Sequence, residues 1–134
     1  MNRLPGTIEA VERSGSIALI DVAVEGNSYT ALLLETDAER FRIGSEVALV
    51  FNETEVALAK NLAGAISLRN RLPAIVVAVE RGQLMSRVLL RVGSHRVSSV
   101  ITTRSLQALQ LQAGDAVEGL VKSNELYLLP EQAA

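Results

Sequence analysis

The sequence contains no cysteine and no tryptophan, a single histidine and few aromatic residues. The absence of cysteine excludes disulfide bonds, thiolate catalysis and cysteine-ligated zinc. His95 has no second histidine or thiol with which to complete a metal site, so we expect no metal held directly by protein ligands. Aromatic residues make up 3% of the chain and apolar residues 49%, so the core must be aliphatic.

Long apolar runs and an excess of positive charge are also missing. No stretch reaches the roughly 18 apolar residues that span a bilayer, and the N-terminus lacks the apolar region of a signal peptide. We therefore expect a cytoplasmic protein with no membrane partner. The net charge of −2 and the scarcity of aromatics argue against a nucleic-acid partner. The sequence also lacks a phosphate-binding glycine loop, a nucleophile elbow and the signature of paired catalytic bases. We therefore expect a protein that is not an enzyme.

The chain does contain an internal repeat. Asn2–Pro5 reads the same as Asn70–Pro73, and Ala10–Arg13 the same as Ala78–Arg81, both at an offset of 68 residues. A two-residue insertion in the second copy then shifts the offset to 70, at which further residues match: Gly44 with Gly114, Val47 with Val117, Glu55 with Glu125 and Leu58 with Leu128. These matches indicate a tandem duplication of a unit of about 60 residues. We predict two repeats, residues 1–62 and 63–134.

Each repeat reads as a series of short strands. Residues 88–92 show the period-2 alternation of a half-buried strand, and residues 20–24 keep it in the first repeat. One short helix interrupts each repeat: Thr36–Glu39 has the form of a capping box, and residues 105–114 end at a breaking glycine. We predict an all-β fold of two tandem OB-like five-stranded barrels, each with one short helix. Barrels this small bury little surface alone, so we expect them to pack on each other and on further copies of the chain.

The two repeats differ in charge. Residues 1–66 hold five basic and ten acidic side chains, and residues 67–134 hold eight basic and five acidic, which gives net charges of −5 and +3. The second repeat can therefore attract an anion more readily than the first. Ordinary drift after duplication is an alternative explanation of the charge difference taken alone.

The substitutions between the two repeats follow one chemical trend. The second repeat carries hydroxyls or cations where the first carries other groups: Lys122 against Asn52, Ser105 against Asp37 and Thr102 against Leu34. Ser67 and Arg69 precede the second Asn-Arg-Leu-Pro run, whereas only Met1 precedes the first. Arginine offers two parallel N–H donors, lysine a compact charge, and hydroxyls neutral donors. This set suits a small tetrahedral oxyanion, although each residue taken singly is also an ordinary surface cation or helix cap.

The second repeat contains four separated segments of note: Ser67–Asn70, Ile101–Ser105, Leu111–Val117 and Val121–Ser123. In that order they resemble the Mop or molbindin module of the wider TOBE family. The first repeat is a weaker match, so the whole chain is similar to a tandem di-Mop protein. The resemblance implies that molybdate or tungstate binds as a ligand, at interfaces between modules or subunits. It implies that the anion contacts Ser67, Arg69, Lys122 and Ser105, and also Thr102 and Ser123.

The resemblance has departures and functional consequences. Leu68 replaces a residue that is usually small, and Asn52 and Asp37 leave the first repeat without a competent cluster. We therefore expect fewer sites per chain than in an intact two-module protein. The resemblance implies cytoplasmic binding of the oxyanion for molybdenum storage or homeostasis, by a homo-oligomer for which a trimer is favoured by analogy. The alternative is an oxyanion-sensing or assembly module that acts through a partner regulator or transporter ATPase.

Overall fold

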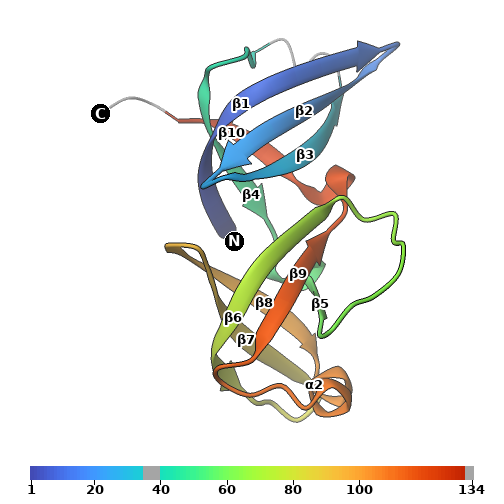
Figure 1. Ribbon diagram of the computed structural model, residues 1–134, viewed down its shortest axis with the longest axis vertical. Coiled ribbons are helices and arrows are strands. Elements are labelled where there is room, and N and C mark those ends of the chain that lie inside the picture. The colour runs from blue at the N-terminus through green and yellow to red at the C-terminus, as the bar shows by residue number, and fades with distance from the viewer. Residues whose placement is uncertain (35–39, 132–134) are drawn as a thin grey trace.

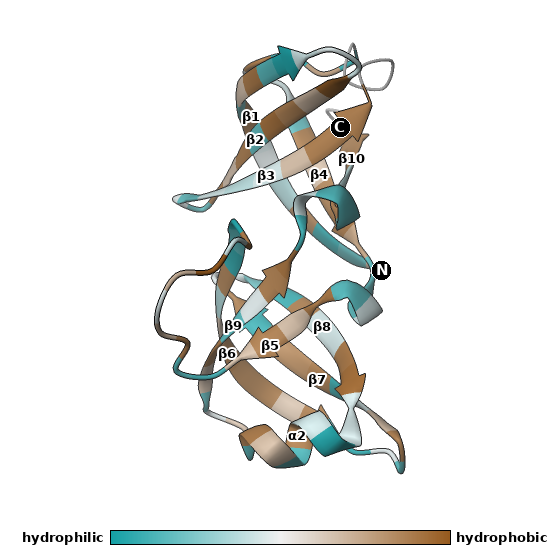
Figure 2. Ribbon diagram, turned by 90° about the vertical axis from the view of Figure 1, so that its right-hand side faces the viewer, coloured by the Kyte–Doolittle hydropathy of each residue, from teal (hydrophilic) through white to brown (hydrophobic). Residues whose placement is uncertain are grey.

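The computed structural model describes residues 1–34 and 40–131, and most of them lie in strands. The strands are β1 (Asn2–Ser14), β2 (Ile17–Val24), β3 (Asn27–Leu34), β4 (Glu46–Phe51), β5 (Ala57–Ala59), β6 (Asn70–Glu80), β7 (Met85–Val92), β8 (His95–Thr102), β9 (Ala116–Val121) and β10 (Tyr127–Pro130). The short helices are η1 (Glu53–Glu55), α2 (Thr103–Leu109) and η2 (Ser123–Glu125). The two five-stranded sheets confirm the predicted all-β fold, and Figures 1 and 2 show them stacked along the long axis of the molecule. Within the described ranges, no helix is long and apolar enough to cross a membrane.

Each sheet contains one strand from the other repeat. The first sheet has the order β10-β4-β1-β2-β3, and the second has the order β5-β9-β6-β7-β8. β5 leaves the first repeat and pairs antiparallel with β9, and β10 leaves the second repeat and pairs antiparallel with β4. Figure 1 shows β10 within the upper sheet and β5 within the lower one. The predicted repeat boundaries, 1–62 and 63–134, stay a prediction, and the two sheets cut across them.

The alternation of apolar residues decides which face of each sheet turns inward. Equivalent positions of β2 and β7 are buried: Ile20, Val22 and Val24 in the first, and Val88, Leu90 and Val92 in the second. Full burial of such a side chain contributes about 1.5–3 kcal/mol, so a register shift by one residue would be strongly unfavourable. The buried side chains form one continuous cluster across both repeats, which includes Val56 after η1 and Leu126 after η2.

The helix predictions have different outcomes in the two repeats. The predicted capping box Thr36–Glu39 lies outside the described residues. In the second repeat α2 spans Thr103–Leu109, so the predicted range 105–114 was wrong at both ends. The helix ends because Gln110 adopts the left-handed conformation, with φ 51° and ψ 46°, which breaks the helical path before Gly114.

We call each five-stranded sheet, with the elements packed on it, a module. Two asparagines at equivalent positions hold the two modules together. The Asn2 side chain donates to the Ser98 carbonyl and accepts from the Ser98 N–H, both at 2.8 Å. The Asn70 side chain donates to the Thr30 carbonyl at 3.0 Å and accepts from the Thr30 N–H at 2.7 Å. Asn2 and Asn70 are both buried. They lie 68 residues apart in the sequence, as do their partners Thr30 and Ser98, so the two contacts are reciprocal. Each asparagine thereby satisfies the backbone of an edge strand, β8 or β3, of the other module.

The turns of two equivalent hairpins also touch. The Glu25 carboxylate, after β2, accepts a hydrogen bond from the Ser94 N–H at 3.1 Å and another from the Ser94 hydroxyl. These donors, with His95 Nε2 at 2.9 Å from Glu25 Oε1, lower the pKa of Glu25 below its usual value. The single histidine therefore takes part in a contact between the modules.

We predict that Asn70→Ala lowers the free energy of unfolding by about 1–3 kcal/mol, because it leaves the half-buried N–H and carbonyl of Thr30 without partners. Urea unfolding monitored by circular dichroism measures the loss. Asn52→Ala is the matched control, since Asn52 is exposed and its side chain does not cap η1. Equal stability of the two variants would show that the clamp contributes nothing.

Candidate oxyanion site

An open pocket of about 560 Å³ lies where the second module meets a segment of the first repeat. The end of β8, the start of α2 and the residue after β9 form one side of it. The other side comes from η1 and the two residues that follow, because the exchange of β5 carries this segment across. The polar lining residues are Thr54, Glu55, Thr102, Ser105, Lys122 and Glu125, and apolar side chains such as Leu68 and Met85 complete the wall.

Three of the six predicted anion contacts lie in this pocket. Thr102, Ser105 and Lys122 line it together, although they come from three separate elements. Ser67 and Arg69 are exposed and do not line it, but Leu68 between them does, so their segment passes along the pocket edge. Ser123, the first residue of η2, is half-buried next to Lys122 and is not part of the lining.

Thr102 and Ser105 have different local roles from those expected. Ser105 was predicted to open the helix, but Thr102 is its N-cap and Ser105 is the third helical residue. The Thr102 hydroxyl accepts the Ser105 N–H at 3.1 Å and donates to the Ser105 hydroxyl oxygen at 2.9 Å. Within the described residues the hydrogen of the Ser105 hydroxyl has no acceptor, so it can be donated into the pocket.

The cations of the second repeat fall into two groups. Lys122 and Arg69 are exposed, and neither lies within 4.0 Å of a carboxylate in the described part of the chain. Arg71, by contrast, donates two hydrogen bonds of 2.6 Å to the Glu118 carboxylate. This bidentate pair raises the pKa of Arg71 and lowers that of Glu118, because each hydrogen bond favours the charged forms. Arg71 is therefore committed to Glu118, whereas Lys122 and Arg69 can bind an anion.

Sequence reasoning missed the residues that the first repeat contributes. Thr54 and Glu55 face the pocket only because strand exchange places η1 beside β8. Glu55 and Glu125 occupy matched repeat positions, and both line the same pocket. The sequence shows that Glu55 and Glu125 occupy matched positions, but it does not show that both side chains line one pocket. The lining of one chain therefore carries two carboxylates and one ammonium group.

The site combines hydrogen-bond donors with two carboxylates, Glu55 and Glu125. Among residues 1–34 and 40–131, no group of three or more histidine, aspartate or glutamate side chains is placed to hold a metal ion. The hydroxyl and ammonium groups that gather in the pocket are hydrogen-bond donors, which suit an oxyanion.

Comparison with protein families gives a match to the TOBE domain over residues 1–58 and again over residues 66–128. Molybdenum-pterin-binding protein 3 of Clostridium pasteurianum is 33% identical over 66 residues, which cover 48% of this chain and 97% of that protein. The molybdenum import ATP-binding protein ModC of Brucella abortus (strain 2308) is 32% identical over 124 residues, which cover 90% of this chain and 32% of that protein.

The fold matches a solved structure along most of its length. The cytoplasmic molybdate-binding protein ModG, in a crystal form with molybdate bound, superposes with a TM-score of 0.91 at 23% identity. The alignment covers 95% of this chain and 94% of that one, which supports the two-module architecture. The chain spans only 32% to 51% of the length of the larger curated relatives it matches.

We predict that Thr102→Ala lowers the free energy of unfolding by about 1 kcal/mol, because the N-cap of α2 is lost, and that Thr102→Ser keeps most of it. Chemical denaturation measures both values. Thr54→Ala provides the control, since Thr54 lines the same pocket and its side chain forms no hydrogen bond in the described part of the chain. A Thr102→Ala variant as stable as the control would mean that the cap is unimportant.

Proposed function

Since this chain belongs to the TOBE domain family, with two tandem modules, we propose that it binds molybdate or tungstate in the pocket of its second module. The prediction of tandem modules of this family is confirmed by the two matches. One observation carries the proposal: the pocket gathers Thr102, Ser105 and Lys122, the positions at which the second repeat gains donors over the first. The molybdate-binding ModG and the molybdenum-pterin-binding relative add support.

The proposed chemistry is recognition without catalysis. The anion exchanges its water shell for the ammonium group of Lys122, the guanidinium group of Arg69 and the hydroxyl of Ser105. Ser67 and Ser123 supply further hydroxyls as the anion draws their segments toward the pocket. Thr102 acts mainly by holding Ser105, since its own hydroxyl hydrogen is already donated to that residue. We place this function, storage or homeostasis of molybdenum, in the cytoplasm.

Such a donor set distinguishes among oxyanions. A protonated phosphate needs an acceptor for its hydrogen, which Lys122, Arg69 and Ser105 do not offer. That hydrogen stays unpaired, at a penalty of about 1–3 kcal/mol, unless it reaches Glu55 or Glu125 on the lining. Sulfate is smaller than molybdate, so a pocket sized for the larger ion holds it less well. Molybdate and tungstate are similar in size and charge, and we expect both to bind.

The charge balance of one chain favours assembly. Lys122 shares the pocket with Glu55 and Glu125, so the lining of a single chain repels a dianion unless further cations join it. Arg69, exposed beside the pocket, is one such cation, and side chains from a second copy are another source. We therefore propose a homo-oligomer, with a trimer favoured, in which contacts between chains complete the site.

An oxyanion-sensing module is the second candidate function. It is favoured by the match to ModC, an ATP-binding import protein of which this chain spans only 32%. In that case the chain would report bound oxyanion to a partner regulator or transporter ATPase.

We predict that Lys122→Ala and Arg69→Ala each weaken molybdate binding at least tenfold, because each removes a charge-assisted hydrogen bond worth about 1.5–3 kcal/mol. Isothermal titration with molybdate, tungstate, sulfate and phosphate gives the affinities. Arg96→Ala is the matched control, an exposed arginine of β8 that does not line the pocket. Unchanged molybdate affinity in both test variants would remove the assigned site.

We also predict that native mass spectrometry with molybdate detects a closed oligomer that carries several anions. Storage predicts this result for the chain alone, whereas sensing predicts anion-dependent binding to a partner. The wild type in sulfate serves as the reference. A monomer that binds molybdate at full affinity would refute the proposed completion of the site by other copies.

A further inference from the structure

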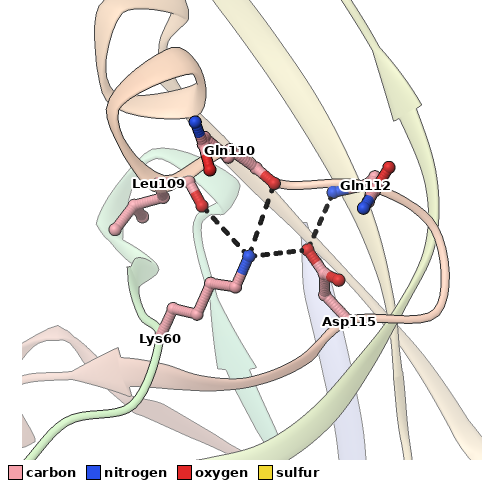
Figure 3. Close-up of polar contacts among 5 residues, drawn as sticks. All are labelled: Lys60, Leu109, Gln110, Gln112 and Asp115. Carbon is pink, nitrogen blue, oxygen red and sulfur yellow. Dashed lines mark hydrogen bonds and ion pairs between the residues drawn. The ribbon is translucent and has the colours of Figure 1, made fainter.

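A lysine that follows the exchanged strand holds the far end of the helix on which Ser105 lies. Lys60 comes directly after β5, three residues beyond the pocket residue Ala57. Its Nζ lies 3.1 Å from Asp115 Oδ2, 3.2 Å from the Leu109 carbonyl and 3.4 Å from the Gln110 carbonyl (Figure 3). The first repeat thus contributes the cation that caps α2 of the second.

The three contacts use the full donor capacity of the ammonium group. Asp115 Oδ2 also accepts the Gln112 N–H at 3.0 Å, so one oxygen joins Lys60 to the loop after α2 (Figure 3). The Gln112 N–H, followed by Lys60, lowers the pKa of Asp115, which keeps its carboxylate charged. Because its hydrogen bonds are already made, Lys60 is poorly suited to bind the anion directly.

The position of α2 depends on such tertiary contacts. A helix of seven residues is too short to be stable by itself in water. Its N-terminal end is held by the Thr102 cap, and Leu106 is buried in the core beneath it. Its C-terminal carbonyls, which have no partner within the helix, accept from Lys60. Loss of the lysine would therefore free one end of the element that aims Ser105.

The first module lacks both partners of the equivalent contact. At the offset of 70, Ser45 stands where the second repeat has Asp115, and Pro130 stands at the position matched to Lys60. The contact is therefore confined to the second module, which carries the donor set of the pocket.

We propose that Lys60 and Asp115 form a latch that positions α2, and with it Ser105, for the oxyanion. Lys60 is in this view a positioning residue of the second module. The inference rests on the proposed function of the pocket, and it extends that function to two residues outside the lining. The latch also ties the strand exchange to binding, since Lys60 reaches α2 only because β5 lies in the second sheet.

Titration of Lys60→Met and Asp115→Asn with molybdate tests the latch against a simple charge effect. The latch predicts that both variants bind molybdate about tenfold more weakly. This is the low end of the loss of affinity seen when a residue that orients an ion-contacting side chain is removed. Long-range electrostatics predicts opposite signs, because Asp115→Asn removes a negative charge near the anion and should tighten binding. Tighter binding by Asp115→Asn would overturn the proposal.

Further variants separate positioning from stability. Arg71→Met breaks the Arg71–Glu118 pair in the same module, away from the pocket lining, and should keep molybdate affinity even where its melting temperature falls. Lys60→Arg retains a cation for Asp115 and should recover part of the affinity. The double variant Lys60→Met/Asp115→Asn should bind no more weakly than the weaker single variant, because both remove one contact.

The outcomes distinguish the two proposals. Wild-type protein that binds molybdate, with unchanged affinity in Lys60→Met and Asp115→Asn at a temperature where all are folded, overturns the latch alone. An equal loss of affinity in Arg71→Met also overturns it, since the effect would then follow stability. Wild-type protein that binds neither molybdate nor tungstate overturns the proposed function and the latch together.

Discussion

The exchange of one strand between the repeats is the constraint on which the remaining structure depends. β5 and β10 complete the sheets of the opposite modules, and the asparagine clamps hold the modules in the matching register. A side-chain amide carries both donor hydrogens and an acceptor oxygen, so it can replace the missing neighbour of an edge strand. Asparagine has the length that reaches Thr30 from Asn70 and Ser98 from Asn2 while its own backbone stays in β6 or β1. Neither module is therefore complete without residues of the other.

The composite pocket follows from this exchange. A strand that crosses to the other sheet takes its flanking residues with it, so η1 lies against β8 on one side and Lys60 reaches α2 on the other. Residues of the first repeat thus surround a cluster of donors that belongs to the second. The same exchange places Glu55 near Lys122, which gives one chain a pocket with mixed charge. With two carboxylates and one ammonium group in the lining, further cations decide whether a dianion binds.

Much of the fold was predictable because the duplication presents the same pattern of apolar residues in both repeats. The alternation at residues 20–24 and 88–92 fixes the buried face, and the matched runs fix the number of modules. The exchange was not predictable, since strands as short as Ala57–Ala59 have the same sequence pattern whichever sheet they join. For the site, residue chemistry indicated Thr102, Ser105 and Lys122 as a group. It could not show that Thr102 is the N-cap of α2 and that Ser105 lies within the helix. Lys60 gave no signal, because a single lysine after a short strand is an ordinary surface residue until its three acceptors are known.

The two kinds of position in this duplicated chain obey different physical requirements. Asn2 and Asn70 perform the same task for opposite modules, so a change in either one leaves a half-buried backbone unit unsatisfied in the other half. No such reciprocity links Lys122 to Asn52, since each faces its own surroundings. A duplicated scaffold can therefore keep its joining residues alike while its surface positions diverge in charge. The net charges of −5 and +3 in the two halves are consistent with this freedom, and an anion site in one module requires no matching site in its neighbour. Strand exchange then makes the first half a partner in shaping that site rather than an inactive copy.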